Sequence, residues 1–305
     1  MKRLLLLILL QMALGVAHAQ TISAHWIAHP VPDSLAHVWF RQNYLCNGRP
    51  LRATVNVAST GLFKLYVNGF IVGTATYYPL RDSDDHTPKA MTFDVTRYMR
   101  NDTNTIALLY SPTCPSVERR QVAVEFYGTN ADGEPFSHYS DGNWLCRNAN
   151  SRLNTNGAET IDGRTYTPSW NMATFDPALW RSASEREEHE LMVAQRQFYA
   201  ATKTVHSRSY YYKDSQNDSV SYEFGQGFVG GIYITLRDAK RGEYINIGGM
   251  EYICTGELDE QAFPLFPRRH LRNVTVWGDR RFRTTQIFDV MTIETATRRV
   301  HDFYE

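Results

Sequence analysis

Short segments in which apolar and polar residues alternate recur along this chain, and they restrict it to a β-rich fold. The clearest of these segments in the first half are residues 38–44, 52–58, 63–67, 70–72, 105–110 and 121–127. The dipeptide Asn68-Gly69 separates two of them and favours the positive φ values of a type I′ hairpin turn. Because many short strands at close spacing are typical of sandwiches, residues 20–184 are predicted to form one jelly-roll-like β-sandwich.

The second half repeats this pattern after a less regular stretch. Strands are predicted at residues 210–212, 220–224, 231–236, 244–247 and 288–293, which makes residues 204–305 a second β-sandwich. Residues 128–182 are rich in Asn, Ser, Gly and Asp and are predicted to form long loops pinned by Trp144, Trp170 and Trp180. A helix is expected from Glu185 to Phe198, within a connector at residues 185–203. The predicted fold class is therefore all-β, with two sandwich domains joined by a short helical or loop connector.

The N-terminus has the pattern of an export signal. Lys2 and Arg3 precede an apolar run, and Ala17-His18-Ala19 supplies a cleavage site with small residues. Residues 1–19 are therefore predicted to be a signal peptide, and the mature protein to be soluble in the periplasm or outside the cell, with no membrane span. An oxidising compartment permits disulfides, and the four cysteines allow three pairings, although buried thiols with at most one bridge are favoured.

Charge and motifs exclude several classes of partner. Lys plus Arg and Asp plus Glu number 32 each, so no basic surface for nucleic acid is expected. Residues 225–230 match G-x-G-x-x-G, but an alternating β-branched segment follows where a dinucleotide site needs a helix. We interpret these glycines as a bulge or a close crossing between strands.

One loop holds candidate metal ligands. Asp82, Asp84 and Asp85 could supply oxygen ligands to calcium, although the spacing lacks the later Gly and Glu of an EF-hand. A solvated acidic loop is the alternative. His25 and His29 stand four residues apart, but Pro30 argues against the helix that would bring them together as metal ligands.

Aromatic side chains and carboxylates supply the remaining candidates. The aromatics that could stack on a sugar are Trp39, Tyr77, Tyr78, Trp144 and Trp170, and burial in a core is the default for each. Glycoside cleavage needs two facing carboxylates, and the sequence does not show that any two of Glu251, Glu257 and Asp259 face each other. No other catalytic motif is present.

Several stretches together resemble a known family. They are residues 63–73, Phe93-Asp94-Val95-Thr96, residues 104–106, residues 157–164, Trp170-Asn171 with Trp180, residues 222–230 and residues 249–258, and they follow the order found in the N-terminal, non-catalytic part of bacterial α-L-rhamnosidases. The resemblance implies a galactose-binding-like jelly roll followed by a second sandwich. It also implies that the catalytic acid and base belong to an α/α barrel that follows this region in the family, so no catalytic residue is assigned here.

The predicted function is binding of a glycan or oligosaccharide without cleavage, as an exported accessory protein. The predicted carbohydrate-binding residues are Asn68, Tyr77, Tyr78, Asp82, Asp85, Trp144 and Trp170, with calcium at Asp82, Asp84 and Asp85 as the one candidate cofactor. Two alternatives stay open. The chain could be a rhamnosidase-type glycoside hydrolase component that acts with a separately encoded catalytic subunit, or it could be a structural scaffold.

Overall fold

The computed structural model describes residues 24–31, 33–73, 75–79, 88–114, 120–186, 203–204, 210, 212–216 and 218–296. Three predictions fall outside these residues in whole or in large part. The signal peptide at residues 1–19 and the acidic loop with Asp82, Asp84 and Asp85 lie outside entirely, and so do residues 187–202 of the connector.

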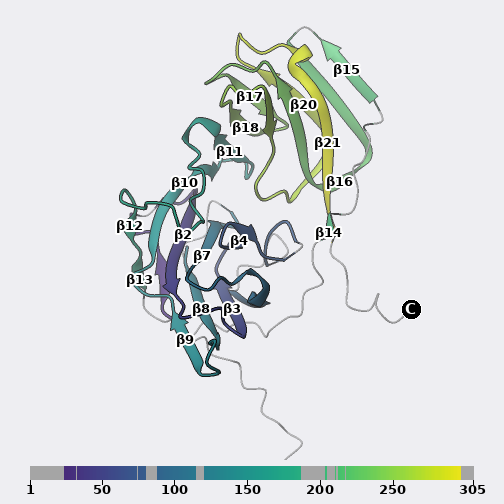
Figure 1. Cartoon of the computed structure of the whole chain (residues 1–305). Coiled ribbons are helices and arrows are strands. Elements are labelled where there is room, and N and C mark those ends of the chain that lie inside the picture. The colour runs from purple at the N-terminus through teal and green to yellow at the C-terminus, as the bar shows by residue number, and fades with distance from the viewer. Residues whose placement is uncertain are drawn as a thin grey trace, which may run out of the picture.

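The first half of the chain forms two facing sheets (Figure 1). One has the order β13 (Ser184–Arg186), β1 (Trp26–Ala28), β8 (Val122–Thr129), β3 (Arg52–Ser59) and β6 (Lys89–Asp94), with β9 (Pro135–Tyr139) paired to β8. The facing strands run β10 (Leu145–Leu153), β2 (Ala36–Leu45), β7 (Thr103–Ser111), β4 (Leu62–Val67) and β5 (Phe70–Ile71), with β12 (Arg181–Ser182) paired to β10. A short 3₁₀ turn, η1 (Thr96–Tyr98), follows β6.

Strand β2 is buried on both of its faces. Val38 and Phe40 point into the core between the two sheets. Trp39 points the other way and packs with Trp170 and Trp180, which belong to the segment that follows η2 (Gly163–Thr165). Because this segment covers the outer face of the sheet, the alternation of β2 separates two apolar clusters instead of core from solvent.

The second half is built around one long strand. β16 (Ser219–Arg237) pairs with β15 (Tyr212–Gln216) and β20 (Arg269–Gly278) near its start, and with β21 (Ile287–Ala296) and β19 (Asp259–Ala262) near its end. β14 (Lys203–Thr204) pairs with β21, β17 (Tyr244–Ile247) pairs with β20 and with β18 (Met250–Ile253), and the 3₁₀ turn η3 (Thr284–Gln286) precedes β21. The register of β16 shifts between Glu223 and Phe228, with Gly225 and Gly227 at φ +63° and +82°. The glycines of the G-x-G-x-x-G stretch therefore form a bulge, as predicted.

A single short strand joins the two halves into one sheet. β11 (Glu159–Asp162) pairs antiparallel with β10 and parallel with β18, so a 15-stranded sheet runs through both sandwiches. Ile161 of β11 packs into the core of the second half beside Tyr252. In Figure 1, β11 lies between the lower and the upper unit.

The all-β prediction is confirmed, because the described residues contain strands and 3₁₀ turns and no α-helix. The Asn68-Gly69 turn is confirmed too, with Val67 paired to Phe70 across it. The boundaries at residues 184 and 204 stay predictions. Trp144, Trp170 and Trp180 are buried, as expected for side chains that pin the surrounding segments, and no disulfide joins the four cysteines, which all lie in described segments.

Two local predictions differ from the structure. The predicted helix does not begin at Glu185, because Glu185 and Arg186 belong to β13, which pairs with β1; residues 187–198 of this prediction lie outside the described residues. The segment 128–182, predicted as loops, contains β9, β10 and β11. At β13 and β10, pairing with a strand distant in sequence decides the backbone conformation and overrides the local composition, whereas β9 forms a local hairpin with β8.

Candidate functional site

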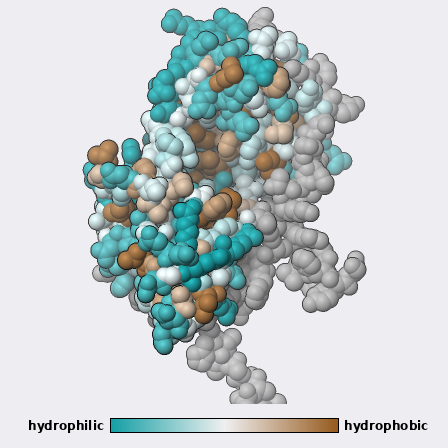
Figure 2. Space-filling model, in the orientation of Figure 1, coloured by the Kyte–Doolittle hydropathy of each residue, from teal (hydrophilic) through white to brown (hydrophobic). Residues whose placement is uncertain are grey.

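A cavity of about 660 Å³ lies where the two sandwiches meet. Strands β2 and β4 and residues 163–171 form its wall on the first sandwich, and Arg241 and residues 252–265 contribute the wall on the second. Figure 2 shows apolar side chains in the hollow between the two units. The site therefore depends on how the two sandwiches are held together.

Glu159 holds them through a buried carboxylate. Its two oxygens accept hydrogen bonds from the backbone N–H groups of Leu265, at 2.8 Å, and Phe266, at 2.7 Å. Burial raises the pKa of Glu159, while these two bonds and the charges of Lys64 and Arg268 act in the opposite direction. A strand of the first sandwich thus fixes a loop of the second next to the cavity.

Aromatic rings form the floor and one edge of the cavity. Trp39 and Trp170 stack with ring centroids 5.3 Å apart and are only 2% and 3% exposed. The Tyr66 ring stands edge-on against Trp170 at 5.4 Å. Tyr166 packs edge-on against Trp39 at 6.2 Å but is 54% exposed. Tyr166 is therefore the lining ring that presents a face to a ligand.

Polar side chains surround these rings. Asn171 comes from the first sandwich, and Arg241, Glu257 and Gln261 come from the second; the last three are exposed. Lys64 lines the cavity from β4, with its Nζ 5.7 Å from the centroid of the Phe266 ring. Burial lowers the pKa of Lys64 to about 8, and the Glu159 carboxylate opposes part of this shift. An aromatic face beside amide, carboxylate and cationic groups is an arrangement suited to a polar, ring-shaped ligand.

The residues predicted to bind carbohydrate fall into different settings. Asn68 is buried, and its Nδ2 donates to the Tyr98 carbonyl at 2.9 Å and to Asn104 Oδ1 at 2.8 Å. Tyr78 and Trp144 belong to the core of the first sandwich.

The other two described candidates lie in the outer cluster. Tyr77 and Trp170 pack there with Trp39, and of the predicted residues Trp170 alone lines this cavity. Asn68, Tyr77, Tyr78 and Trp144 are buried and make packing contacts or internal hydrogen bonds, and their assignment to carbohydrate binding stays a prediction. Tyr77, Tyr78, Trp144 and Trp170 are buried, which is the default expectation for aromatic side chains.

No sequence motif marks most of the cavity. Tyr166, Arg241 and Gln261 stand in no motif, whereas Glu257 stands in a stretch that resembles the family and is also a candidate carboxylate for glycoside cleavage. Their proximity results from the pairing of β11 with β18, which brings together segments about 90 residues apart in sequence. A parallel contact of that range leaves no local pattern.

Metal ligation finds no support among the residues that the structure describes. They contain no group of three or more His, Cys, Asp or Glu side chains placed to hold a metal ion. His29 Nδ1 lies 2.9 Å from the Val31 carbonyl, and His25 Nδ1 lies 3.8 Å from the Glu185 carboxylate. The calcium prediction concerns the acidic loop outside the described residues and stays a prediction.

Comparison with known proteins identifies the family. The family described as "Alpha-L-rhamnosidase N-terminal domain" matches residues 48–204, slightly more than half of the chain. The chain belongs to this family. An α-L-rhamnosidase of Formosa agariphila is 21% identical over 245 residues, which are 74% of this chain and 26% of that protein.

Solved structures of α-L-rhamnosidases share the fold. That from Dictyoglumus thermophilum has a TM-score of 0.78 at 21% identity over 90% of this chain and 36% of that chain. That from Streptomyces avermitilis, solved with L-rhamnose, has a TM-score of 0.73 at 19% identity over 88% of this chain and 29% of that chain. The chain thus spans about a third or less of the length of these relatives.

The motif by which the chain resembles this family builds the junction. Within residues 157–164, Glu159 bonds the loop of the second sandwich, and the Asp162 carboxylate accepts from the Arg164 backbone N–H at 3.0 Å and from its guanidinium at 2.7 Å. Hydrogen bonding by Arg164 holds the pKa of Asp162 below its usual range. Both carboxylates are thereby engaged within the protein, so the motif stabilises the wall of the cavity.

No helix in the described segments is long and apolar enough to cross a membrane.

Proposed function

We propose that this chain binds carbohydrate in the cavity between its two sandwiches and does not cleave it. The observation that carries the proposal is Tyr166, a half-exposed ring on the cavity edge beside Asn171, Arg241 and Glu257. Aromatic faces stack on the apolar faces of sugar rings, while amides and charged groups bond the hydroxyls. Family membership supports this proposal, since the similar proteins are named as α-L-rhamnosidases.

The cavity lining favours binding over cleavage. Among its described lining residues Glu257 is the one carboxylate, and glycoside hydrolysis uses a pair of carboxyl groups about 5–10 Å apart. Asp162 and Glu159 lie near the same wall but are bonded to Arg164 and to backbone N–H groups. This arrangement holds a sugar without an acid and base on either side of its glycosidic bond.

Calorimetry tests the binding. The purified full-length chain is titrated with L-rhamnose and with neutral mono- and disaccharides, with and without Ca²⁺ because of the predicted acidic loop. Tyr166→Ala is expected to weaken binding about fivefold, since a stacked ring contributes on the order of 1 kcal/mol. Tyr139→Ala, an exposed ring on β9 outside the cavity lining, is the matched control and leaves the affinity unchanged. No measurable heat with any sugar, or equal losses in both variants, contradicts the proposal.

A turnover assay separates binding from cleavage. The same chain is incubated with a nitrophenyl α-L-rhamnoside, and no release of nitrophenol above the buffer rate is expected. Release by the purified chain contradicts the non-cleaving role and favours the alternative of a glycoside hydrolase component. Release only after a helical-barrel protein is added indicates a chain that completes a separately encoded enzyme.

We also propose that the chain is exported and loses residues 1–19. The basic residues Lys2 and Arg3, the apolar run after them and Ala17-His18-Ala19 support this. When the chain is produced in a host with a secretory pathway, N-terminal sequencing is expected to begin at Gln20 in the exported fraction. An exported protein that begins at Met1, or no exported protein, overturns the proposal.

A further inference from the structure

The described lining of the cavity carries more cationic than anionic charge. Lys64 and Arg241 are the cationic side chains of the described lining, and Glu257 is its one carboxylate. Glu159 lies near Lys64 and Asp162 near Arg241, but Glu159 accepts hydrogen bonds from backbone N–H groups and Asp162 accepts them from Arg164. Lys64 Nζ makes no hydrogen bond to any described residue, and its neighbour is the Phe266 ring. An ammonium group taken partly out of water without an acceptor gains most from a ligand that brings a negative charge.

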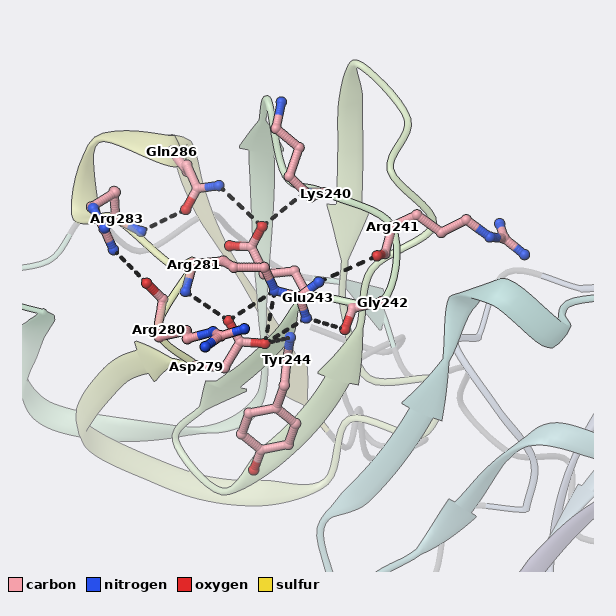
Figure 3. Close-up of polar contacts among 10 residues, drawn as sticks. All are labelled: Lys240, Arg241, Gly242, Glu243, Tyr244, Asp279, Arg280, Arg281, Arg283 and Gln286. Atoms are coloured by element: carbon pink, nitrogen blue, oxygen red, sulfur yellow. Dashed lines mark hydrogen bonds and ion pairs between the residues drawn. The ribbon is translucent and has the colours of Figure 1, made fainter.

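Arg241 is presented to the cavity by a fixed turn. Figure 3 shows its side chain extending away from the network that holds residues 240–243. In that network, Arg281 donates to the backbone carbonyls of Arg241 and Gly242 and to the Asp279 carboxylate.

The far side of the same turn is held by Glu243. Its Oε2 accepts from the Lys240 backbone N–H at 2.8 Å and from Gln286 Nε2 at 3.3 Å. The Arg241 guanidinium itself takes no part beyond one long bond of 3.4 Å to the Thr255 carbonyl. The turn is therefore rigid, while most of the five N–H donors of Arg241 stay available.

We propose that the sugar bound in this cavity is an acidic one, a uronic acid residue whose carboxylate is recognised by Lys64 and Arg241. The inference rests on the proposed function and adds the chemical class of the ligand. The Tyr166 ring stacks on the face of the sugar ring, and every hexose offers a face for such stacking. The guanidinium fork of Arg241 matches the geometry of a carboxylate, and Lys64 adds a point charge from the more enclosed side.

Matched sugar pairs test the charge alone. The full-length chain is titrated with the methyl glycosides of glucose, galactose and mannose, each beside its uronic acid counterpart, which differs only at C6. The uronate of at least one pair is expected to bind roughly tenfold more tightly than its neutral partner, because a hydrogen bond to a charged group is stronger than one to a neutral group. Raising the salt concentration is expected to weaken the uronate and not the neutral sugar.

Two variants assign the effect to the cavity. Arg241→Gln and Lys64→Met are each expected to reduce the uronate preference, measured as the ratio of uronate affinity to neutral-sugar affinity, severalfold. Arg186→Gln, an exposed arginine on β13 outside the cavity lining, is the control and keeps the full preference. Since Arg241 is exposed and its turn is held by other residues, that variant is expected to fold even if Lys64→Met does not.

The outcomes separate this inference from the proposed function. Equal or tighter binding of the neutral sugars overturns the acidic ligand but leaves carbohydrate binding standing. A uronate preference that survives both variants overturns the assignment to Lys64 and Arg241. If no sugar binds in any pair, both the inference and the proposed function fail.

Discussion

His37 is a fully buried histidine whose protonation state couples folding to pH. Its Nδ1 lies 2.8 Å from Ser151 Oγ and its Nε2 lies 3.0 Å from Ser111 Oγ, with the Phe266 ring edge-on at 5.2 Å. Burial, and to a lesser extent the positive charges of Arg268 and Lys64, lowers the pKa of His37 from 6.5 to about 3. The folded chain therefore keeps this imidazole neutral at pH values where the unfolded chain protonates it.

The sign and size of the effect follow from this difference. Between pH 6.5 and 3 the unfolded state binds more protons at His37 than the folded state, so the free energy of unfolding falls as the pH falls through that window. From pH 7 to pH 5, protonation of a group with a pKa of 6.5 in the unfolded state alone lowers this free energy by about 2 kcal/mol. Acidification is thus expected to weaken the fold even before the carboxylates titrate.

Urea titrations at pH 7 and pH 5 measure the effect in the full-length chain and in His37→Gln, whose amide can bond one of the two serines. Between pH 7 and pH 5, the free energy of unfolding of the wild-type chain is expected to fall by about 2 kcal/mol more than that of His37→Gln. Titration of the other groups is common to both proteins and cancels in the comparison. An equal loss in both proteins would refute the reasoning, because it would mean that His37 titrates alike in the folded and unfolded chains.

Two pairs of substitutions test the backbone features that the sequence predicted correctly. Asn68→Ala removes two donated bonds and the bond accepted from the Thr105 N–H. It also replaces an Asn that tolerates φ +52° by a residue that adopts this left-handed conformation less readily, so the free energy of unfolding should fall by about 3 kcal/mol in a urea titration. Asn68→Gly keeps the conformational freedom and should lose less; if it is as destabilised as Asn68→Ala, the positive φ contributes nothing. Gly227→Ala places a Cβ 2.9 Å from the His270 ring at a residue with φ +82°, whereas the Cβ of Gly225→Ala meets no atom within 4 Å. Thermal melting should therefore show that Gly227→Ala lowers the free energy of unfolding by about 1–3 kcal/mol more than Gly225→Ala does. Equal losses for the two glycines would contradict the close crossing at the bulge.

Features set by nearest neighbours in sequence could be predicted well. The Asn68-Gly69 turn needs positive φ at two successive residues, and few residue types other than Asn and Gly adopt this conformation. The stretch 225–230 could be separated from a nucleotide site because the segment after it alternates as a strand does, and β16 indeed continues to Arg237. Both predictions depend on local backbone preferences that no distant contact reverses.

Features set by distant contacts could not be predicted. Within β10, residues 147–151 read Arg-Asn-Ala-Asn-Ser, a loop-like composition, yet Arg147 and Asn148 pair with β2, and Ser151 lies 2.8 Å from Nδ1 of the buried His37. Tyr77 and Tyr78 are neighbours in sequence but pack in two different clusters, one on each side of the sheet. Whether an aromatic ring is exposed depends on which segment covers it, and that is a tertiary property.

The family resemblance and the candidate site overlap in part, because Trp170, Asn171 and Glu257 line the cavity and also stand in stretches that resemble the family. Glu159 and Asp162, which match the family motif, use their carboxylates on backbone N–H groups and on Arg164. Tyr166 and Arg241, which remain available to a ligand, lie outside the matching stretches. The motif therefore specifies how the two sandwiches are joined. Because a ligand that touches both Tyr166 and Arg241 contacts both sandwiches, its binding energy also stabilises their junction, and specificity can vary through these two side chains while the junction stays the same.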